Sequence, residues 1–185
     1  MKRLLIAAAL VAVSSGSNAG IVLWNAHLDT AQAVATNAGS PLATGSGVAY
    51  GTYDTVSNLL TYTVAFTGLG APLTLGHIHG PSAGPGTNAP VIVEAPTLTG
   101  TPIGSTSGQF SESQDLDLLP AAIGMPSIVD SVWEPQFFGG LWYINLHTER
   151  FRGGEIRGQV HVPEPSGLAL LALGLAGLVG LRKRR

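Results

Sequence analysis

The chain contains no cysteine, and only 11% of its 185 residues are charged. Without cysteine it can form no disulfide, no thiolate metal site and no cysteine nucleophile. Low charge is unlike intrinsically disordered chains, which combine high charge with few apolar residues, whereas 45% of this sequence is apolar. The length indicates one folded domain of ordinary size with additional terminal segments.

Basic residues are almost absent from the interior of the sequence. Six of the nine Lys and Arg lie at the two ends, and residues 20–165 contain three Arg and eleven acidic residues, a formal charge of −8. Phosphate backbones repel such a surface, so we expect no nucleic acid among the partners. The sequence also lacks the serine-hydrolase, zinc-protease and phosphate-loop motifs, and no catalytic residue is assigned.

The first nineteen residues have the pattern of a secretory signal peptide. Lys2 and Arg3 precede an apolar run over 4–13 and a stretch of small residues that ends at Ala19. A transmembrane anchor is the alternative, but about ten apolar residues cross only half of a bilayer core of about 30 Å. We therefore expect residues 1–19 to be a signal peptide that directs export through the inner membrane.

The other end has three parts in a fixed order. Pro163, Glu164 and Pro165 precede sixteen uncharged residues (166–181) and four basic ones. As a helix the uncharged segment would be about 24 Å long, marginally enough to cross a bilayer. The arrangement over 163–185 resembles a PEP-CTERM sorting tail. This implies a short transmembrane helix that holds the protein in the membrane until an exosortase-type enzyme removes it, leaving the product at the cell surface or outside the cell. A permanent single-span anchor is the alternative.

The residues between these ends have the pattern of a β-rich domain. Apolar and polar residues alternate over short runs bounded by Gly, Pro, Ser and Thr, which is typical of antiparallel strands. Residues 20–162 therefore predict an all-β fold, an antiparallel Greek-key-like β-sandwich or barrel, with a short helical insertion within 115–133. The expected strands are 21–28, 46–53, 59–66, 75–79, 90–94, 105–113, 141–147 and 155–162.

Three motifs follow one another in the second half of this domain: GHIHGP at 76–81, WYINLHT at 142–148 and GGEIRGQV at 153–160. Together they resemble the CHRD (chordin-type) domain, over roughly residues 21–162. The resemblance implies an extracellular β-sandwich. We accordingly expect a non-catalytic module of the cell surface or extracellular matrix, with exopolysaccharide or surface proteins as its partners.

The histidines suggest an alternative function. His77 and His79 are separated by one residue, so on a strand both imidazoles project from the same face. This spacing chelates copper or zinc, and His147 is the natural third ligand, with His27 a weaker fourth. The chain would then be a metal-binding protein, or a redox enzyme with an arrangement similar to that of copper–zinc superoxide dismutase.

The same polar residues fit a purely structural interpretation. Asn145 and His147 share a strand face, and a network with Thr148 and Glu155 would tie strand ends together without any metal. We expect Asn145, Glu155 and Arg157 to support the turn at Gly153 and Gly154, since a planar guanidinium can bridge several acceptors. A general-base role for Glu155 is the alternative, which would require a cleft and a raised pKa.

The two terminal patterns predict the mass of the mature protein. We expect it to begin near Gly20 and to end at about Pro165, because both ends carry processing signals and the interior carries none. Intact-mass measurement of protein released by the native host checks this. A released form that still contains Leu168–Leu181 would contradict it.

Overall fold

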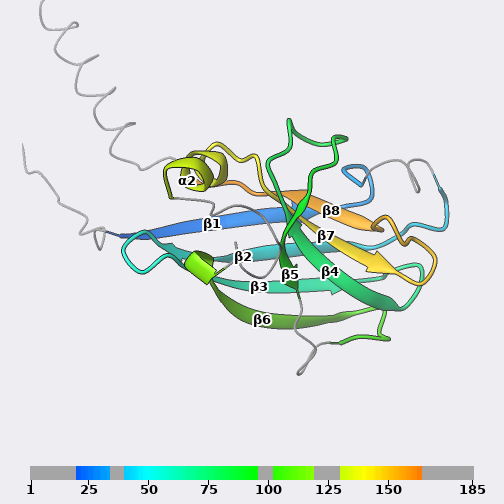
Figure 1. Ribbon diagram of the computed structural model, residues 1–185. Coiled ribbons are helices and arrows are strands. Elements are labelled where there is room, and N and C mark those ends of the chain that lie inside the picture. The colour runs from blue at the N-terminus through cyan, green and yellow to red at the C-terminus, as the bar shows by residue number, and fades with distance from the viewer. Residues whose placement is uncertain (1–19, 34–39, 96–101, 119–129, 164–185) are drawn as a thin grey trace, which may run out of the picture.

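The computed structural model describes residues 20–33, 40–95, 102–118 and 130–163 (Figure 1). The expected signal peptide, and the expected sorting tail apart from Pro163, lie outside these ranges. No helix within them is long and apolar enough to cross a membrane. The strands are β1 (Ile21–Leu28), β2 (Ser46–Asp54), β3 (Leu59–Thr67), β4 (Leu73–His79), β5 (Val91–Ala95), β6 (Gly108–Asp115), β7 (Tyr143–Thr148) and β8 (Ile156–Gln159).

The described strands form two antiparallel sheets that pack as a sandwich. One sheet has the order β1-β2-β3-β6 and the other β5-β4-β7-β8, so the chain crosses from one sheet to the other after β3, after β5 and again after β6. Apolar residues from both sheets meet in one core. The expected all-β sandwich is confirmed, whereas the barrel alternative is wrong, because the described strands form no closed barrel.

The two sheets are joined along one edge, where the first strand meets the last (Figure 1). Asn25 and His161 exchange two backbone hydrogen bonds of 2.9 and 2.7 Å, and Asp29 and Arg157 exchange two more of 3.0 Å. This contact explains why β8 is shorter than the expected 155–162 strand. After Gln159 the chain leaves regular pairing with β7, and His161 pairs with β1 instead.

The strand expected over 21–28 coincides with β1, and the remaining expected strands each overlap an observed one with shifted ends. The strand expected from Ser105 begins only at Gly108, because the backbone carbonyls of the residues before it form hydrogen bonds outside β3. The carbonyl of Ser105 accepts from the N–H of Leu73, and that of Thr106 accepts from the N–H of Leu69, in the segment that leads to the opposite sheet. These residues therefore connect the sheets rather than extend β6.

Helical structure begins where it was expected but continues further along the chain. A 3₁₀ turn, η1, covers Leu116–Leu118, and α2 covers Asp130–Phe138. Trp133 and Phe137 of α2 are four residues apart, so they lie on one side of the helix, and both are buried. Their rings meet those of Tyr53 and Trp142 at centroid distances of 4.9 to 5.9 Å, so α2 covers one end of the core.

Strand β7 is buried on both faces. Ile144 and Leu146, with Trp142 just before the strand, belong to the hydrophobic core. Asn145 and His147 are on the other face, where they are buried among polar groups. The predicted alternation is confirmed, and the strand places polar residues of the second face at fixed positions above the core.

Glu155 is a carboxylate with no exposed surface that connects three segments of the chain. Its Oε1 accepts hydrogen bonds from the N–H of Gly45 at 3.3 Å and of Gly70 at 2.6 Å, and its Oε2 accepts one from the Thr148 hydroxyl at 2.9 Å. The expected contact with Thr148 is therefore present. Backbone and hydroxyl donors compensate the cost of burying this charge.

We expect Leu146→Ala to lower the free energy of unfolding by about 2–5 kcal/mol, because the truncation leaves a cavity in the core. Denaturant unfolding of the purified domain measures the change. Leu23→Ala is the matched control, since Leu23 is 67% exposed and its truncation should change stability by less than about 0.5 kcal/mol. Equal effects of the two variants would mean that the register of β7 is wrong.

We expect Glu155→Gln to destabilise the fold by about 1–3 kcal/mol, because a neutral amide accepts backbone hydrogen bonds more weakly than a carboxylate and only one of its two ends accepts. The exposed Glu149→Gln is the control for the change in net charge. Thermal and denaturant melts of both variants provide the comparison. If both substitutions had the same effect, the buried contacts of Glu155 would contribute nothing beyond net charge.

Candidate metal centre

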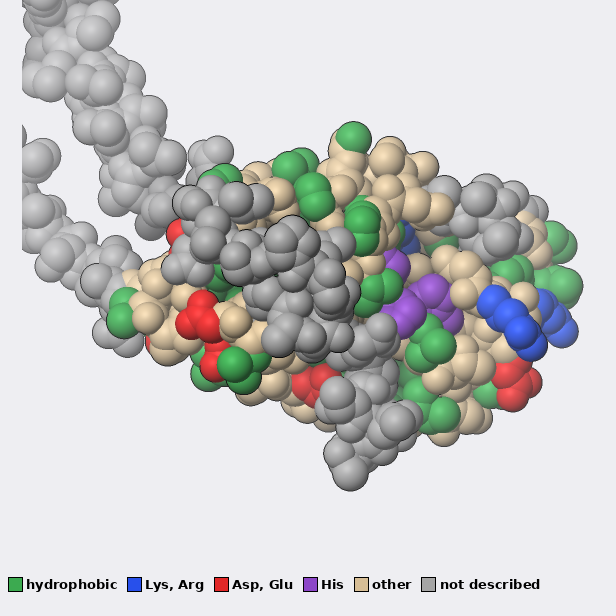
Figure 2. Space-filling view, in the orientation of Figure 1, with side chains coloured by type: hydrophobic (Ala, Val, Ile, Leu, Met, Phe, Trp, Pro, Cys, Tyr) green, Lys and Arg blue, Asp and Glu red, His purple; other side chains and the backbone are tan. Residues whose placement is uncertain are grey.

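Three histidines meet on the outer face of the β5-β4-β7-β8 sheet. His77 and His79 belong to β4 and His147 to the neighbouring β7, where His77 lies opposite Asn145. The ring centroids are 4.8 Å apart for His77 and His147, 5.3 Å for His77 and His79, and 6.4 Å for His79 and His147. Histidine side chains reach the molecular surface in the view of Figure 2.

The arrangement of their nitrogens is close to that of a three-coordinate metal site. One ring nitrogen from each histidine lies within 4.8 Å of the other two. Three atoms at such separations all lie within about 2.8 Å of a common central point, whereas zinc–nitrogen bonds measure about 2.0–2.1 Å. Modest rotations of the rings would therefore bring all three nitrogens to bonding distance of one ion.

Two of the rings are held by backbone carbonyl groups. His147 Nδ1 is 2.7 Å from the carbonyl oxygen of Arg152, and His79 Nδ1 is 2.9 Å from that of Ala89. A carbonyl can only accept, so both Nδ1 atoms carry a proton, and in a neutral ring Nε2 then keeps its lone pair. Metal-ligating histidines are oriented by the same kind of hydrogen bond.

The lone pair of His79 has no hydrogen-bond partner. His79 Nε2 is buried, and no described group donates to it. Burial lowers the pKa of His79 to about 4, and the nearby His77, His147 and Arg157 act in the same direction. The ring is therefore neutral at physiological pH, the form that binds a metal ion.

The polar network that was the alternative interpretation is also present. His77 Nδ1 lies 3.0 Å from His147 Nε2, and the amide nitrogen of Asn145 lies 3.3 Å from the same atom. Asn145 also donates to the carbonyl of Gly153 at 3.1 Å, and its amide fills the space where a side chain on Gly154 would lie. Asn145 thus holds the glycine turn. The short contact between His77 and His147 requires a shared proton, and a bound metal ion would take the place of that proton.

A stack of planar groups supports the ring of His79. It lies on Tyr143 with a centroid distance of 4.7 Å and an interplanar angle of 3°. The guanidinium carbon of Arg157 is 3.4 Å from the centroid of the Tyr143 ring. Since β7 lies between β4 and β8, Tyr143 is held between the imidazole and the cation.

Arg157 connects this stack to the loop between β4 and β5. Although it is only 1% exposed, it forms no ion pair within the described part of the chain. Its guanidinium donates to the carbonyls of Thr87 at 2.9 Å and Gly84 at 3.0 Å, and to the hydroxyl of Ser82 at 3.1 Å. The loop that carries Ala89, the acceptor of His79, is thus fixed by a residue of β8.

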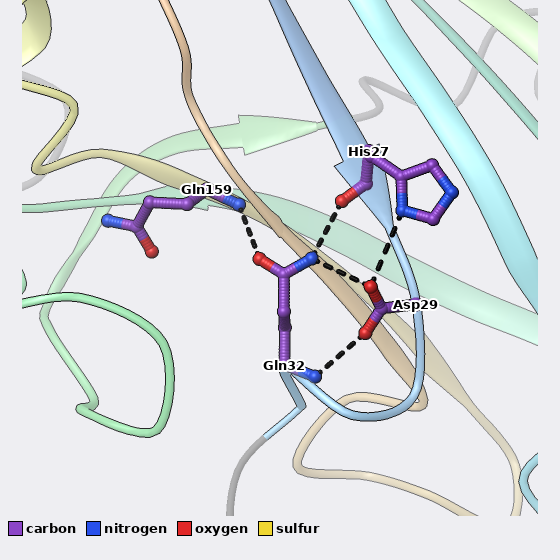
Figure 3. Close-up of polar contacts among 4 residues, drawn as sticks. All are labelled: His27, Asp29, Gln32 and Gln159. Carbon is purple, nitrogen blue, oxygen red and sulfur yellow. Dashed lines mark hydrogen bonds and ion pairs between the residues drawn. The ribbon is translucent and has the colours of Figure 1, made fainter.

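His27, expected as a weaker fourth ligand, lies outside this group. It belongs to β1 in the other sheet, its side chain is 72% exposed, and its Nδ1 is 3.4 Å from Asp29 (Figure 3). Gln32 donates to Asp29 and to the carbonyl of His27, and accepts from the N–H of Gln159. The expectation was wrong because sequence alone did not show that His27 and the other histidines are in different sheets.

The anchoring groups of the site were not found from the sequence. The carbonyls of Ala89 and Arg152 carry no residue-type signal, since every residue has one. The acceptors of Arg157 around Ser82 lie in a loop whose glycines and prolines indicated only an irregular connection. His77, His79 and His147, by contrast, were found from spacing and strand alternation.

Comparison with known proteins identifies two regions. The family model of the CHRD domain matches residues 24–160, and that of the PEP-CTERM protein-sorting motif matches residues 161–185. Neither a curated protein nor a solved structure matches the chain. The sorting motif directs export through the membrane to the cell surface or extracellular space, in an exosortase system. With most of its length matched by the first of these models, the chain belongs to the CHRD domain family.

Proposed function

We propose that the exported protein is a non-catalytic module of the cell surface or extracellular matrix that binds one copper or zinc ion through His77, His79 and His147. The observation that carries this proposal is the unpartnered, buried Nε2 of His79 beside two further imidazoles. An orphaned buried acceptor costs free energy, and a metal ion would remove that cost.

The choice of metal follows from the ligands. All three are imidazoles, which bind a metal ion in their neutral form, and no carboxylate belongs to the group of possible ligands in the described residues. Nitrogen ligands suit copper and zinc, whereas calcium and magnesium prefer oxygen. The carbonyl anchors of His79 and His147 keep the Nδ1 protons in place, so both rings would bind through Nε2.

The processing of the chain is part of the same proposal. Residues 1–19 would be removed as a signal peptide, and the tail 163–185 would be recognised at Pro163, Glu164 and Pro165 and removed by the exosortase-type enzyme. The domain left outside the cell would comprise residues 20–162. These boundaries leave every strand and all three histidines in the mature protein.

An exopolysaccharide partner has support on the opposite sheet. Tyr50, which is 53% exposed, lies beside Thr63 of β3, which in turn pairs with Ser111 of β6. These residues line a shallow depression with Thr61 and Ser113. An exposed aromatic ring among hydroxyl groups suits an uncharged sugar chain, because the ring contacts its apolar faces and the hydroxyls bind its hydroxyls.

We expect the metal-free mature domain to bind one equivalent of copper or zinc at pH 7.5 and to unfold at a higher temperature when the ion is present. Free metal at 100 times the dissociation constant should add about 2.7 kcal/mol to the free energy of unfolding. Calorimetric titration and elemental analysis measure the stoichiometry, and thermal melts measure the stabilisation.

His27→Ala is the matched control for the metal experiment, since it removes a histidine outside the cluster. It should leave metal binding unchanged, whereas the triple variant His77→Ala, His79→Ala, His147→Ala should lose it. The melts of the wild-type domain decide the question even if the triple variant does not fold. A melting temperature unaffected by either metal would rule out the metal-binding function.

A further inference from the structure

We infer that the metal centre keeps an open coordination position and that this position binds a small anion, which enters through a cleft beside His147 and is held by Asn145 and Arg152. The inference rests on the proposed metal binding and adds a ligand class to it. Three observations carry it: the number and charge of the ligands, the cleft, and a buried amide donor.

Three neutral ligands would leave the charge of the metal ion uncompensated and one of its coordination positions open. Three imidazoles fill three of the four positions of a tetrahedral ion, as in zinc sites that keep one position for water or substrate. Because the imidazoles are neutral, the ion would keep its full positive charge. The buried guanidinium of Arg157, stacked on Tyr143, adds another positive charge nearby. An anion at the fourth position would reduce this unbalanced charge.

A cleft of about 550 Å³ opens beside the centre, at His147. It is lined by Thr74, Leu75, His147, Glu149 and Arg152. His147 is thus shared by the metal centre and the cleft, although the residue is only 7% exposed. The exposed Arg152 forms no ion pair within the described ranges, so its guanidinium can bind an entering anion. Glu149 offsets part of that charge, and the metal ion supplies the main attraction.

Asn145 supplies a hydrogen-bond donor at the same place. Its side chain is buried, and the amide nitrogen donates one N–H to the carbonyl of Gly153 and directs the other towards His147 Nε2 at 3.3 Å. When a metal ion takes that lone pair, the second N–H loses its acceptor. An anion bound to the metal would provide a new acceptor, so metal and anion binding should support each other.

The test uses the mature protein loaded with Cu²⁺ and titrated with sodium azide. Azide bound to Cu²⁺ gives a charge-transfer absorption band, which reports binding directly. Arg152→Ala should weaken azide binding several-fold while copper affinity stays the same, because the bond to His147 comes from the backbone carbonyl of residue 152. Arg150→Ala is the matched control, since Arg150 does not line this cleft. A parallel titration with acetate distinguishes inorganic anions from carboxylates.

The outcomes separate this inference from the proposed function. Absence of copper binding would overturn the metal centre itself. Copper binding without an azide band would leave the metal centre in place and overturn the open position. Equal losses in Arg152→Ala and Arg150→Ala would show a general charge effect and overturn entry through the cleft. Acetate that displaces azide would assign carboxylates to the site as well, and acetate without effect would restrict it to inorganic anions.

Discussion

Burial of β7 on both faces is the constraint on which the rest of the structure depends. A strand with one solvated face tolerates many polar residues there, but a polar side chain on a strand covered on both sides needs hydrogen-bond partners within the protein. The amide nitrogen of Asn145, Nδ1 of His147 and the hydroxyl of Thr148 form hydrogen bonds with the hairpin that follows β7 and with Glu155, whereas Oδ1 of Asn145 is buried without a partner among the described groups. The core and His147 of the histidine cluster therefore lie on two sides of one strand, and changes to either should affect the other.

The site is held by residues distant from it in the sequence. Arg157 on β8 binds the carbonyls of the β4–β5 loop, and that loop presents Ala89 to His79. Glu155 binds the N–H groups of Gly45 and Gly70, which fixes the loops beside the hairpin. The hydrogen bonds to Ala89 and Arg152 limit the rings of His79 and His147 to small rotations, so both rings are orientated before any ligand arrives.

Sequence patterns predicted those parts of the molecule that depend on local periodicity. Alternation identified the strands and placed Asn145 and His147 on one face, and the one-residue spacing placed His77 and His79 on one face. His147 approaches these two because β4 pairs with β7. The sequence showed no such pairing, and His147 was chosen as the third ligand for its residue type and strand face. The backbone acceptors of Ala89 and Arg152 had no signature at all, and His27 was misplaced because sheet membership is a property of the whole fold.

The joining of β1 to β8 has a consequence for how the protein is made. These strands are the first and last of the domain, so their hydrogen bonds form only after the whole domain has been synthesised. Contacts between distant parts of a chain slow folding, because a large loop must be closed before they add stability. An exported chain crosses the membrane from its N-terminus onward, and the edge of the sandwich cannot close until residue 161 has emerged. A tail that keeps the end of the chain at the membrane would give the last strand time to find the first before release.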